Sequence, residues 1–272
     1  MRRGVVVGLL ALAACAAPPP PVPVTEPTVP PVAGIAAEAV RLRTDEAVGG
    51  QVHLRITDTG TAAFTVTSVA LDSPGFRAVA PHEVRTEFPP GRTFALPVQY
   101  GEVACDADVE PAAARLTVVR PDGAVEDLRV PLAGDDLARV HAEECAVAAA
   151  LAAVGVTVEG FSGTGVTLGG EVVVRRRAAD GPVRVLALQR SVVLEPVPGR
   201  ELPEVLAAGD EELRLPVTVR SASCEPHVLA ETKQPFVFPL RVQIGAAEEV
   251  AVDLPLDDGQ RRQLQELLGR VC

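Results

Sequence analysis

The chain is poor in aromatic side chains. Its 272 residues include no tryptophan, one tyrosine, Tyr100, and seven phenylalanines. Carbohydrate-binding surfaces and the energetic centres of protein interfaces usually depend on tryptophan and tyrosine. The composition therefore disfavours a sugar-stacking platform and an aromatic-rich interface.

Positive charge is also scarce. Lysine and arginine number 25 against 36 aspartates and glutamates, the formal net charge is -11, and Lys233 is the only lysine. The one basic cluster, Arg175-Arg176-Arg177, comes at the end of an expected strand, and we expect it to be a solvated edge. An acidic chain without a basic stripe does not suit nucleic acid or an anionic membrane surface. We expect no nucleic-acid partner.

No apolar run is long enough to span a bilayer, which needs about 20 residues. The longest N-terminal run, Gly4 to Leu12, follows Arg2 and Arg3, an order typical of an export signal. A twin-arginine route receives only weak support, because the rest of that motif is missing.

The export signal ends in Leu12-Ala13-Ala14-Cys15, which matches a bacterial lipobox. We therefore expect residues 1–14 to be a lipoprotein signal peptide and Cys15 to carry lipid. This predicts a chain anchored in the cell membrane, on its extracytoplasmic face. The alternative is ordinary secretion, with cleavage near Ala14 to Ala17.

Residues 15–33 are rich in proline, with Pro18 to Pro21 in an unbroken run. Proline fixes φ and favours extended polyproline II, so this tract forms no core. At about 3.1 Å per residue, fifteen residues of such a tract span roughly 45 Å. We interpret it as a stalk; a proline-rich ligand for a partner domain is the alternative.

The remaining chain repeats one order of landmarks. Each copy has a Leu-Pro-Val triplet, a cysteine eight residues after its proline, a second proline-centred triplet, an acidic pair and a helical segment holding another cysteine. The matching landmarks are Leu96-Pro97-Val98 with Leu215-Pro216-Val217, Cys105 with Cys224, Val130-Pro131-Leu132 with Leu254-Pro255-Leu256, and Cys145 with Cys272. The repeat predicts two domains, at residues 34–149 and 150–272.

Short alternating segments predict the fold of each copy. Val52, Leu54 and Ile56 alternate with polar residues, the period of a half-buried strand. Six or seven such strands per copy, with regular turns, predict an all-β chain of two tandem immunoglobulin-like antiparallel β-sandwiches. Each sandwich is expected to end in a short C-terminal helix. Pro97 and Pro216 lie inside strand patterns, which predicts edge strands or bulges.

The four cysteines after Cys15 form an even set in an oxidising compartment, and three pairings are possible. The repeat selects Cys105–Cys145 and Cys224–Cys272. A metal is the alternative, because His141-x3-Cys145 and Cys224-x2-His227 have ligand-like spacings. These two pairs lie in different copies and neither has a match in the other copy, so we expect disulfides, no metal and no cofactor.

The densest polar group surrounds Cys224. Glu225, His227, Glu231 and Lys233 follow it in an expected inter-strand segment. We interpret these four residues as a possible recognition loop; a loop merely held by the disulfide is the alternative.

Nothing in the sequence supports catalysis. His53 and His82 are expected at the surface or in turns, and no Ser/His/Asp or paired-carboxylate arrangement is apparent. We therefore expect a protein that is not an enzyme.

The chain resembles a class of uncharacterised actinobacterial exported lipoproteins with tandem immunoglobulin-like β domains. The lipobox at Cys15, the repeated Leu-Pro-Val…Cys and Cys224-Glu225-Pro226-His227 carry this resemblance. The resemblance implies a location and an architecture, and no activity. We expect a non-catalytic binding or scaffolding module at the cell envelope, with an unidentified envelope protein or ligand as partner. An exported metal- or small-ligand-binding protein using His141 and His227 is the alternative.

The anchor is directly testable. Cys15→Ser removes the thiol to which lipid is attached, so the variant is expected to leave the membrane fraction and to lack the lipid mass increment. Membrane fractionation and mass spectrometry of the N-terminal peptide measure both effects, with Ala16→Ser as the control. Retention of the Cys15→Ser chain in the membrane contradicts the prediction.

Overall fold

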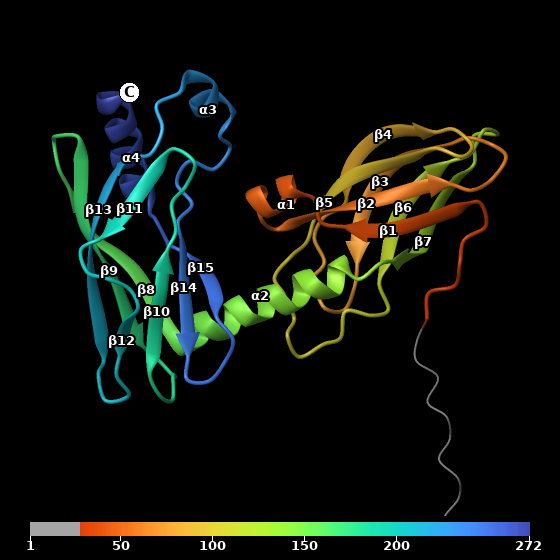
Figure 1. Cartoon of the computed structure of the whole chain (residues 1–272). Helices are drawn as coiled ribbons and strands as arrows, with labels where there is room; N and C mark the ends of the chain where they lie inside the picture. Colours follow the sequence, from red (N-terminus) through yellow and green to blue (C-terminus); the bar gives the residue numbers. More distant parts are fainter. Residues whose placement is uncertain (1–27) are drawn as a thin grey trace, which may run out of the picture.

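The computed structural model describes residues 28–272 of the chain (Figure 1). The expected signal peptide at residues 1–14, the lipidation site Cys15 and most of the linker at 15–33 lie outside the described residues. Within residues 28–272, no helix has both the length and the apolarity needed to cross a membrane.

The first half of the chain forms a β-sandwich. Its strands are β1 (Ile35–Val40), β2 (Gln51–Asp58), β3 (Phe64–Asp72), β4 (His82–Phe88), β5 (Thr93–Gln99), β6 (Ala113–Val119) and β7 (Val125–Ala133). They follow the order β4-β3-β6-β7-β1-β2-β5. The ends of this order meet across the core, because the rings of Phe88 in β4 and Phe94 in β5 lie 5.3 Å apart.

The side chains of β2 are buried in the alternating pattern that predicted this strand from the sequence. Val52, Leu54 and Ile56 are fully buried, which is the result expected when every second side chain of a strand faces the core. One pairing differs from the expected antiparallel pattern. Strand β1 pairs parallel with β7, with Ala37 opposite Leu132, and this pair joins the two layers of the sandwich.

The second half forms another β-sandwich, from two antiparallel four-stranded sheets. One sheet has the order β12-β10-β14-β15 and the other β11-β13-β9-β8. The strands are β8 (Val154–Ser162), β9 (Thr167–Arg176), β10 (Val183–Leu188), β11 (Leu194–Pro198), β12 (Glu204–Leu206), β13 (Glu212–Ser221), β14 (Pro239–Ile244) and β15 (Val250–Asp253). Each sandwich has its own cluster of buried apolar residues. The chain is therefore mostly β, with two immunoglobulin-like sandwiches.

The two strand prolines behave differently. Pro97 lies on the edge strand β5, as expected, whereas Pro216 lies on the inner strand β13, so the prediction of an edge there was wrong. The carbonyl of Pro216 accepts a hydrogen bond from Gly199 N at 2.7 Å, on the side of β11. Because the amide and carbonyl of one strand residue point to the same side, the N–H that proline lacks would face the end of β11. The ladder between β13 and β9 loses no bond.

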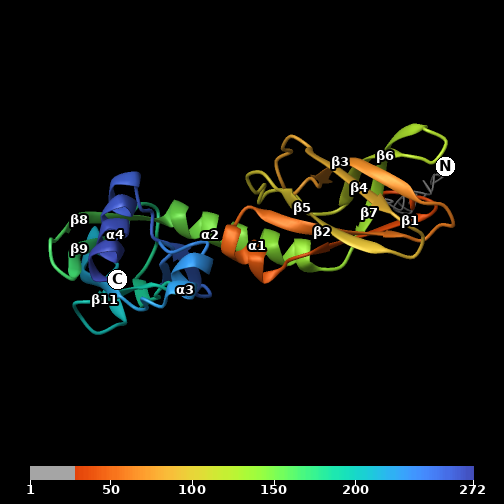
Figure 2. The ribbon, with the colours of Figure 1, turned by 90° about the horizontal axis from the view of Figure 1, so that it is seen from above.

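The helix of the first copy is longer than expected. Helix α2 spans Asp136–Ala153, and Leu137 and Val140 are buried against the first sandwich. The short helix predicted here was wrong because the alanine-rich sequence continues the helix into the second sandwich. There Ala150 joins the second core and Ala153 packs against it. Figure 2 shows α2 running between the two sandwiches.

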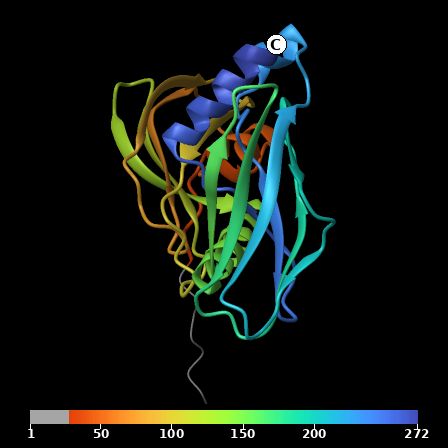
Figure 3. The same cartoon turned by 90° about the vertical axis from the view of Figure 1, so that its left-hand side faces the viewer.

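The second copy ends in α4 (Asp258–Val271), the short C-terminal helix that was expected. Asp257 caps it, since its Oδ1 accepts from Gln260 N at 2.7 Å and Gln260 Oε1 accepts from Asp257 N at 2.9 Å. This reciprocal pair is a capping box. Leu264, Leu267 and Leu268 are buried, so the apolar stripe packs on the sandwich, along the upper end of its strands in Figure 3.

Both disulfides selected by the repeat are present. Cys105–Cys145 has a Cα–Cα distance of 5.6 Å, and Cys224–Cys272 has one of 5.2 Å. The first joins a loop of the first sandwich to the middle of α2, and the second joins the end of α4 to the segment after β13. Loops of this length contribute about 4 kcal/mol each in the chain-entropy account.

Three of the four edge strands of the second sandwich, β8, β11 and β15, are protected. Gln260 Nε2 in α4 donates to the carbonyl of Val158 in the edge strand β8 at 2.7 Å. The edge strand β11 carries Pro196 and Pro198, and α2 lies against β15. Blocked carbonyls, prolines and a covering helix all oppose the addition of a foreign strand.

The arginine cluster is not simply a solvated edge. Arg176 donates to four backbone carbonyls in the adjoining turns: those of Ala179, Gly181, Ala207 and Asp210, at 2.7 to 3.0 Å. Arg175 forms ion pairs with Glu159 and Glu212 on the sheet surface. The expectation for Arg176 was wrong because its side chain joins the turn that follows β9 to the distant turn that holds Ala207 and Asp210.

Arg176→Ala removes all four hydrogen bonds and leaves their acceptors with fewer partners. We expect a loss of about 2 to 4 kcal/mol in the free energy of unfolding, measured by urea denaturation. The control, Arg220→Ala, removes an exposed ion pair with Glu195 and is expected to lose less than about 1 kcal/mol. Equal losses in both variants contradict the role assigned to Arg176.

Tyr100 offers a direct test of how α2 is attached. Its hydroxyl donates to Glu144 Oε1 in α2 at 2.7 Å. Burial, and then the hydrogen bond and charge of Glu144, raise the pKa of Tyr100 above its ordinary value of about 10. Folding holds the phenol protonated, so this contribution to stability is fully present below about pH 10 and is lost as the pH rises through the raised pKa.

Because Tyr100 is the only tyrosine and tryptophan is absent, phenolate absorbance reports this residue alone. We expect phenolate to form at a higher pH in the native chain than in the chain unfolded in urea. Glu144→Gln is expected to lower the pKa of Tyr100, since it removes the adjacent negative charge. Identical titration curves for the native and unfolded chains would overturn the assignment.

Candidate binding groove between the two sandwiches

One wall of the candidate site is helix α1 (Arg43–Val48), which follows β1. It is held by Asp45, whose carboxylate is 1% exposed and accepts from Leu42 N at 2.8 Å, Gln51 Nε2 at 2.7 Å and His53 Nδ1 at 2.9 Å. An ionised carboxylate only accepts hydrogen bonds, so His53 donates. The expectation that His53 lies at the surface was wrong: this partly buried side chain in β2 holds α1 in place.

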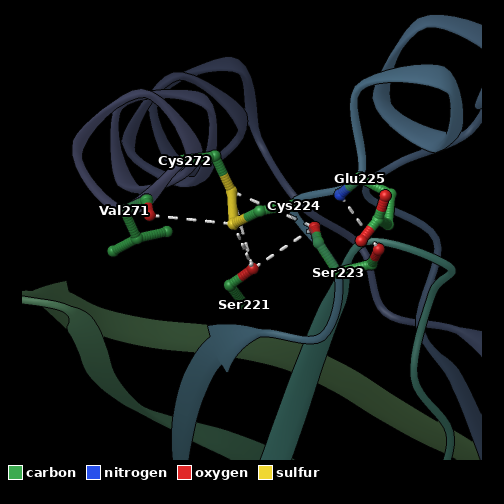
Figure 4. Close-up of a disulfide and its surroundings, with 6 residues drawn as sticks. All are labelled: Ser221, Ser223, Cys224, Glu225, Val271 and Cys272. Carbon is green, nitrogen blue, oxygen red and sulfur yellow. Dashed lines mark hydrogen bonds between the residues drawn. A yellow bond between two sulfur atoms is a disulfide. The ribbon is translucent and has the colours of Figure 1, made fainter.

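The other wall is helix α3 (Pro226–Glu231), in the segment between β13 and β14. The Cys224–Cys272 disulfide fixes the start of this segment, and Ser221 Oγ lies 3.4 Å from Cys224 Sγ (Figure 4). Val228 and Leu229 pack against the second core. The wall is therefore tied covalently at its start and by apolar contact in its middle.

Helices α1 and α3 lie on opposite sides of a groove of about 700 Å³. The groove thus joins residues of both sandwiches, and Figure 1 shows the two helices on the same side of α2. Most lining side chains are polar or charged, with a few aliphatic ones. The lining residues are Arg43, Thr44, Glu46, Arg190, Ser191, Val192, His227, Val228, Glu231, Thr232, Lys233, Gln234, Val237 and Pro239.

Three of the four residues of the predicted recognition loop line this groove. His227, Glu231 and Lys233 are exposed and belong to the lining, on and just after α3. Glu225 is also exposed, but it lies beside the disulfide, where its amide donates to Ser223 Oγ at 3.3 Å (Figure 4). The segment forms a helix and not the irregular loop expected from the sequence.

The charged groups of the groove have no ionic partner inside the described part of the chain. Arg43, Arg190 and Lys233 make no ion pair among residues 28–272, and neither do Glu46 and Glu231. All five side chains are exposed. They are thus available to a charged ligand without the breaking of an internal ion pair.

The structure does not bring together the residues of the metal alternative. His141 contacts the ring of Phe76, and its Nε2 lies 3.1 Å from the carbonyl oxygen of Ala104, whereas His227 lies on α3. The sulfurs of Cys145 and Cys224 are in disulfides. Among residues 28–272, no group of three or more His, Cys, Asp or Glu side chains is arranged to hold a metal ion.

No pattern in the sequence indicated the α1 wall. Arg43, Glu46 and Arg190 were not singled out, and they lie far from Lys233 along the chain. Arg190 belongs to the same sandwich as Lys233, whereas the proximity of Arg43 and Glu46 to Lys233 depends on how α2 places one sandwich beside the other. His82, expected at the surface, is exposed on β4.

No protein-family model matches the chain, and no curated protein matches it in sequence. Among solved structures, the YadV chaperone is 12% identical over 82% of this chain and 100% of that chain, with a TM-score of 0.23. The CsuC–CsuE chaperone–adhesion subunit complex of Acinetobacter baumannii is 12% identical over 76% and 92%, with a TM-score of 0.21. The human OSCAR ligand-binding domain is 13% identical over 84% and 98%, with a TM-score of 0.21. At TM-scores this low, these likenesses carry no argument about function.

Proposed function

We propose that this protein is a non-catalytic binding module, held by lipid at Cys15 on the extracytoplasmic face of the cell membrane, that binds an envelope partner in the groove between α1 and α3. The groove is the observation that carries the proposal. It gathers five exposed charged side chains that form no ion pair in the described chain: Arg43 and Glu46 on α1, Glu231 on α3, and Arg190 and Lys233 in the adjoining segments.

The position of the groove suits a stalked module. Strand β1 begins next to the linker and leads directly to α1 (Figure 1). Six residues in a strand extend about 20 Å, so the groove lies at the opposite end of β1 from the proposed anchor. A partner is then met on the side of the first sandwich that faces away from the stalk.

The protected strand edges support the same choice of surface. Strand addition is a common way for β domains to bind peptides. Gln260 on β8, the prolines of β11 and the cover of α2 on β15 oppose it at three of the four edges of the second sandwich. Binding through side chains in the groove requires no free edge.

Lys233 provides the test, because it is the only lysine and it lines the groove. An amine-reactive photo-crosslinker is attached to the purified full-length chain, whose single lysine places it in the groove, and the labelled chain is then returned to its native membrane. We expect a discrete adduct with a partner after illumination, identified by mass spectrometry.

The matched control moves the amine out of the groove. Lys233→Arg combined with Arg262→Lys preserves the net charge and places the crosslinker on α4, where position 262 is exposed. The adduct is expected to disappear in this variant. The same adducts from both positions, or none from Lys233, would count against binding in the groove.

A further inference from the structure

The size and openness of the groove indicate the form of its ligand. At about 700 Å³ it is more than twice as large as the other surface hollows described, which measure about 260 to 310 Å³. It is widely open to solvent, whereas sites for small molecules enclose most of the ligand surface. An open groove between two helices fits an extended segment of another chain better than a compact molecule.

The lining excludes two familiar kinds of occupant. None of the described residues that line the groove is phenylalanine, tyrosine or tryptophan. Sugars are usually held by stacking on aromatic rings, and proline-rich segments dock in aromatic-lined grooves. The apolar side chains of the lining are aliphatic, from Val192, Val228, Val237 and Pro239. Val192 is 59% exposed, a large value for an apolar side chain.

The charges of the lining indicate the sign of the ligand. Arg43, Arg190 and Lys233 outnumber Glu46 and Glu231, so the groove is locally positive on a chain whose net charge is -11. A ligand that leaves the fewest of these groups unpaired carries more acidic than basic side chains. The acidic surface elsewhere also repels such a ligand, so complementarity is confined to the groove.

Building on the proposed function, we infer that the groove binds an extended segment of a partner protein that is rich in aspartate or glutamate and contains small aliphatic side chains. The carboxylates of the segment pair with Arg43, Arg190 and Lys233. Its aliphatic side chains rest on Val192 and Val237.

Fluorescence anisotropy tests this with the full-length chain in detergent and a labelled octapeptide of alternating aspartate and valine. Two further probes replace aspartate by glutamine or by lysine. We expect the acidic probe to bind about tenfold more tightly than the neutral one. This difference in affinity is expected to decrease as salt is added. The lysine probe is expected to bind most weakly.

Variants locate the effect in the groove. Arg190→Glu with Lys233→Glu is expected to lower the affinity for the acidic probe about tenfold and to raise the affinity for the lysine probe. Arg190→Gln with Lys233→Gln introduces no new charge, so it is expected to lower the affinity for the acidic probe less than the two glutamate substitutions do. The control, Arg85→Glu with Arg262→Glu, makes the same change in net charge at exposed positions outside the lining, and is expected to change affinity by less than about twofold.

The outcomes separate this inference from the proposed function. Two results overturn the inference that the ligand is an acidic segment. One is equal affinity for the acidic and neutral probes, and the other is an equal loss of affinity in the groove and control variants. If crosslinking from Lys233 captures a partner but no probe binds, the peptide form of the ligand is wrong and the groove still stands as a binding surface. If crosslinking from Lys233 also captures nothing, the proposed function fails with it.

Discussion

Packing of α2 against both sandwiches is the constraint on which the rest of the structure depends. The N-terminal half of the helix is bound to the first sandwich by Cys105–Cys145 and by the hydrogen bond from Tyr100 to Glu144. Its C-terminal end enters the second core through Ala150. Because one continuous helix makes both sets of contacts, the two sandwiches share a rigid element where a tandem repeat often has a flexible loop.

Several weak contacts act together at the first end of α2. Arg41 forms an ion pair with Glu143, and its backbone amide donates to Asp136 Oδ2 at 2.7 Å. Arg41 directly follows β1 and precedes α1, so the residues that hold α2 also fix where α1 begins. The groove wall and the connecting helix are thus set by one short stretch of chain. An exposed ion pair alone contributes little to stability. The Cys105–Cys145 disulfide holds the neighbouring turn of α2 against the first sandwich, so these contacts stay close together.

The sequence predicted the features carried by a local pattern or by the repeat. The repeated landmarks selected both disulfides, the alternation at Val52, Leu54 and Ile56 identified a buried strand, and a short C-terminal helix was expected in the second copy. It missed features that depend on particular side-chain hydrogen bonds or on the length of a helix: the bond between His53 and Asp45, the carbonyls bound by Arg176, and the continuation of α2 past Cys145. The candidate site was half predictable for the same reason. Lys233 and its neighbours stood out as a polar cluster, whereas Arg43 and Arg190 join them only through the tertiary arrangement.

Because α2 continues beyond Cys145 as a helix, the position of one groove wall relative to the other depends on how many helical residues separate the two sandwiches. Each residue of an α-helix turns the chain by about 100° and advances it by about 1.5 Å. The stretch between the disulfide at Cys145 and the core contact at Ala150 therefore sets the angle at which the second sandwich faces the first. One residue added or removed there would rotate α3 by about 100° around the helix axis, away from α1. The number of residues in this stretch is thus as much a part of the binding surface as the side chains that line it.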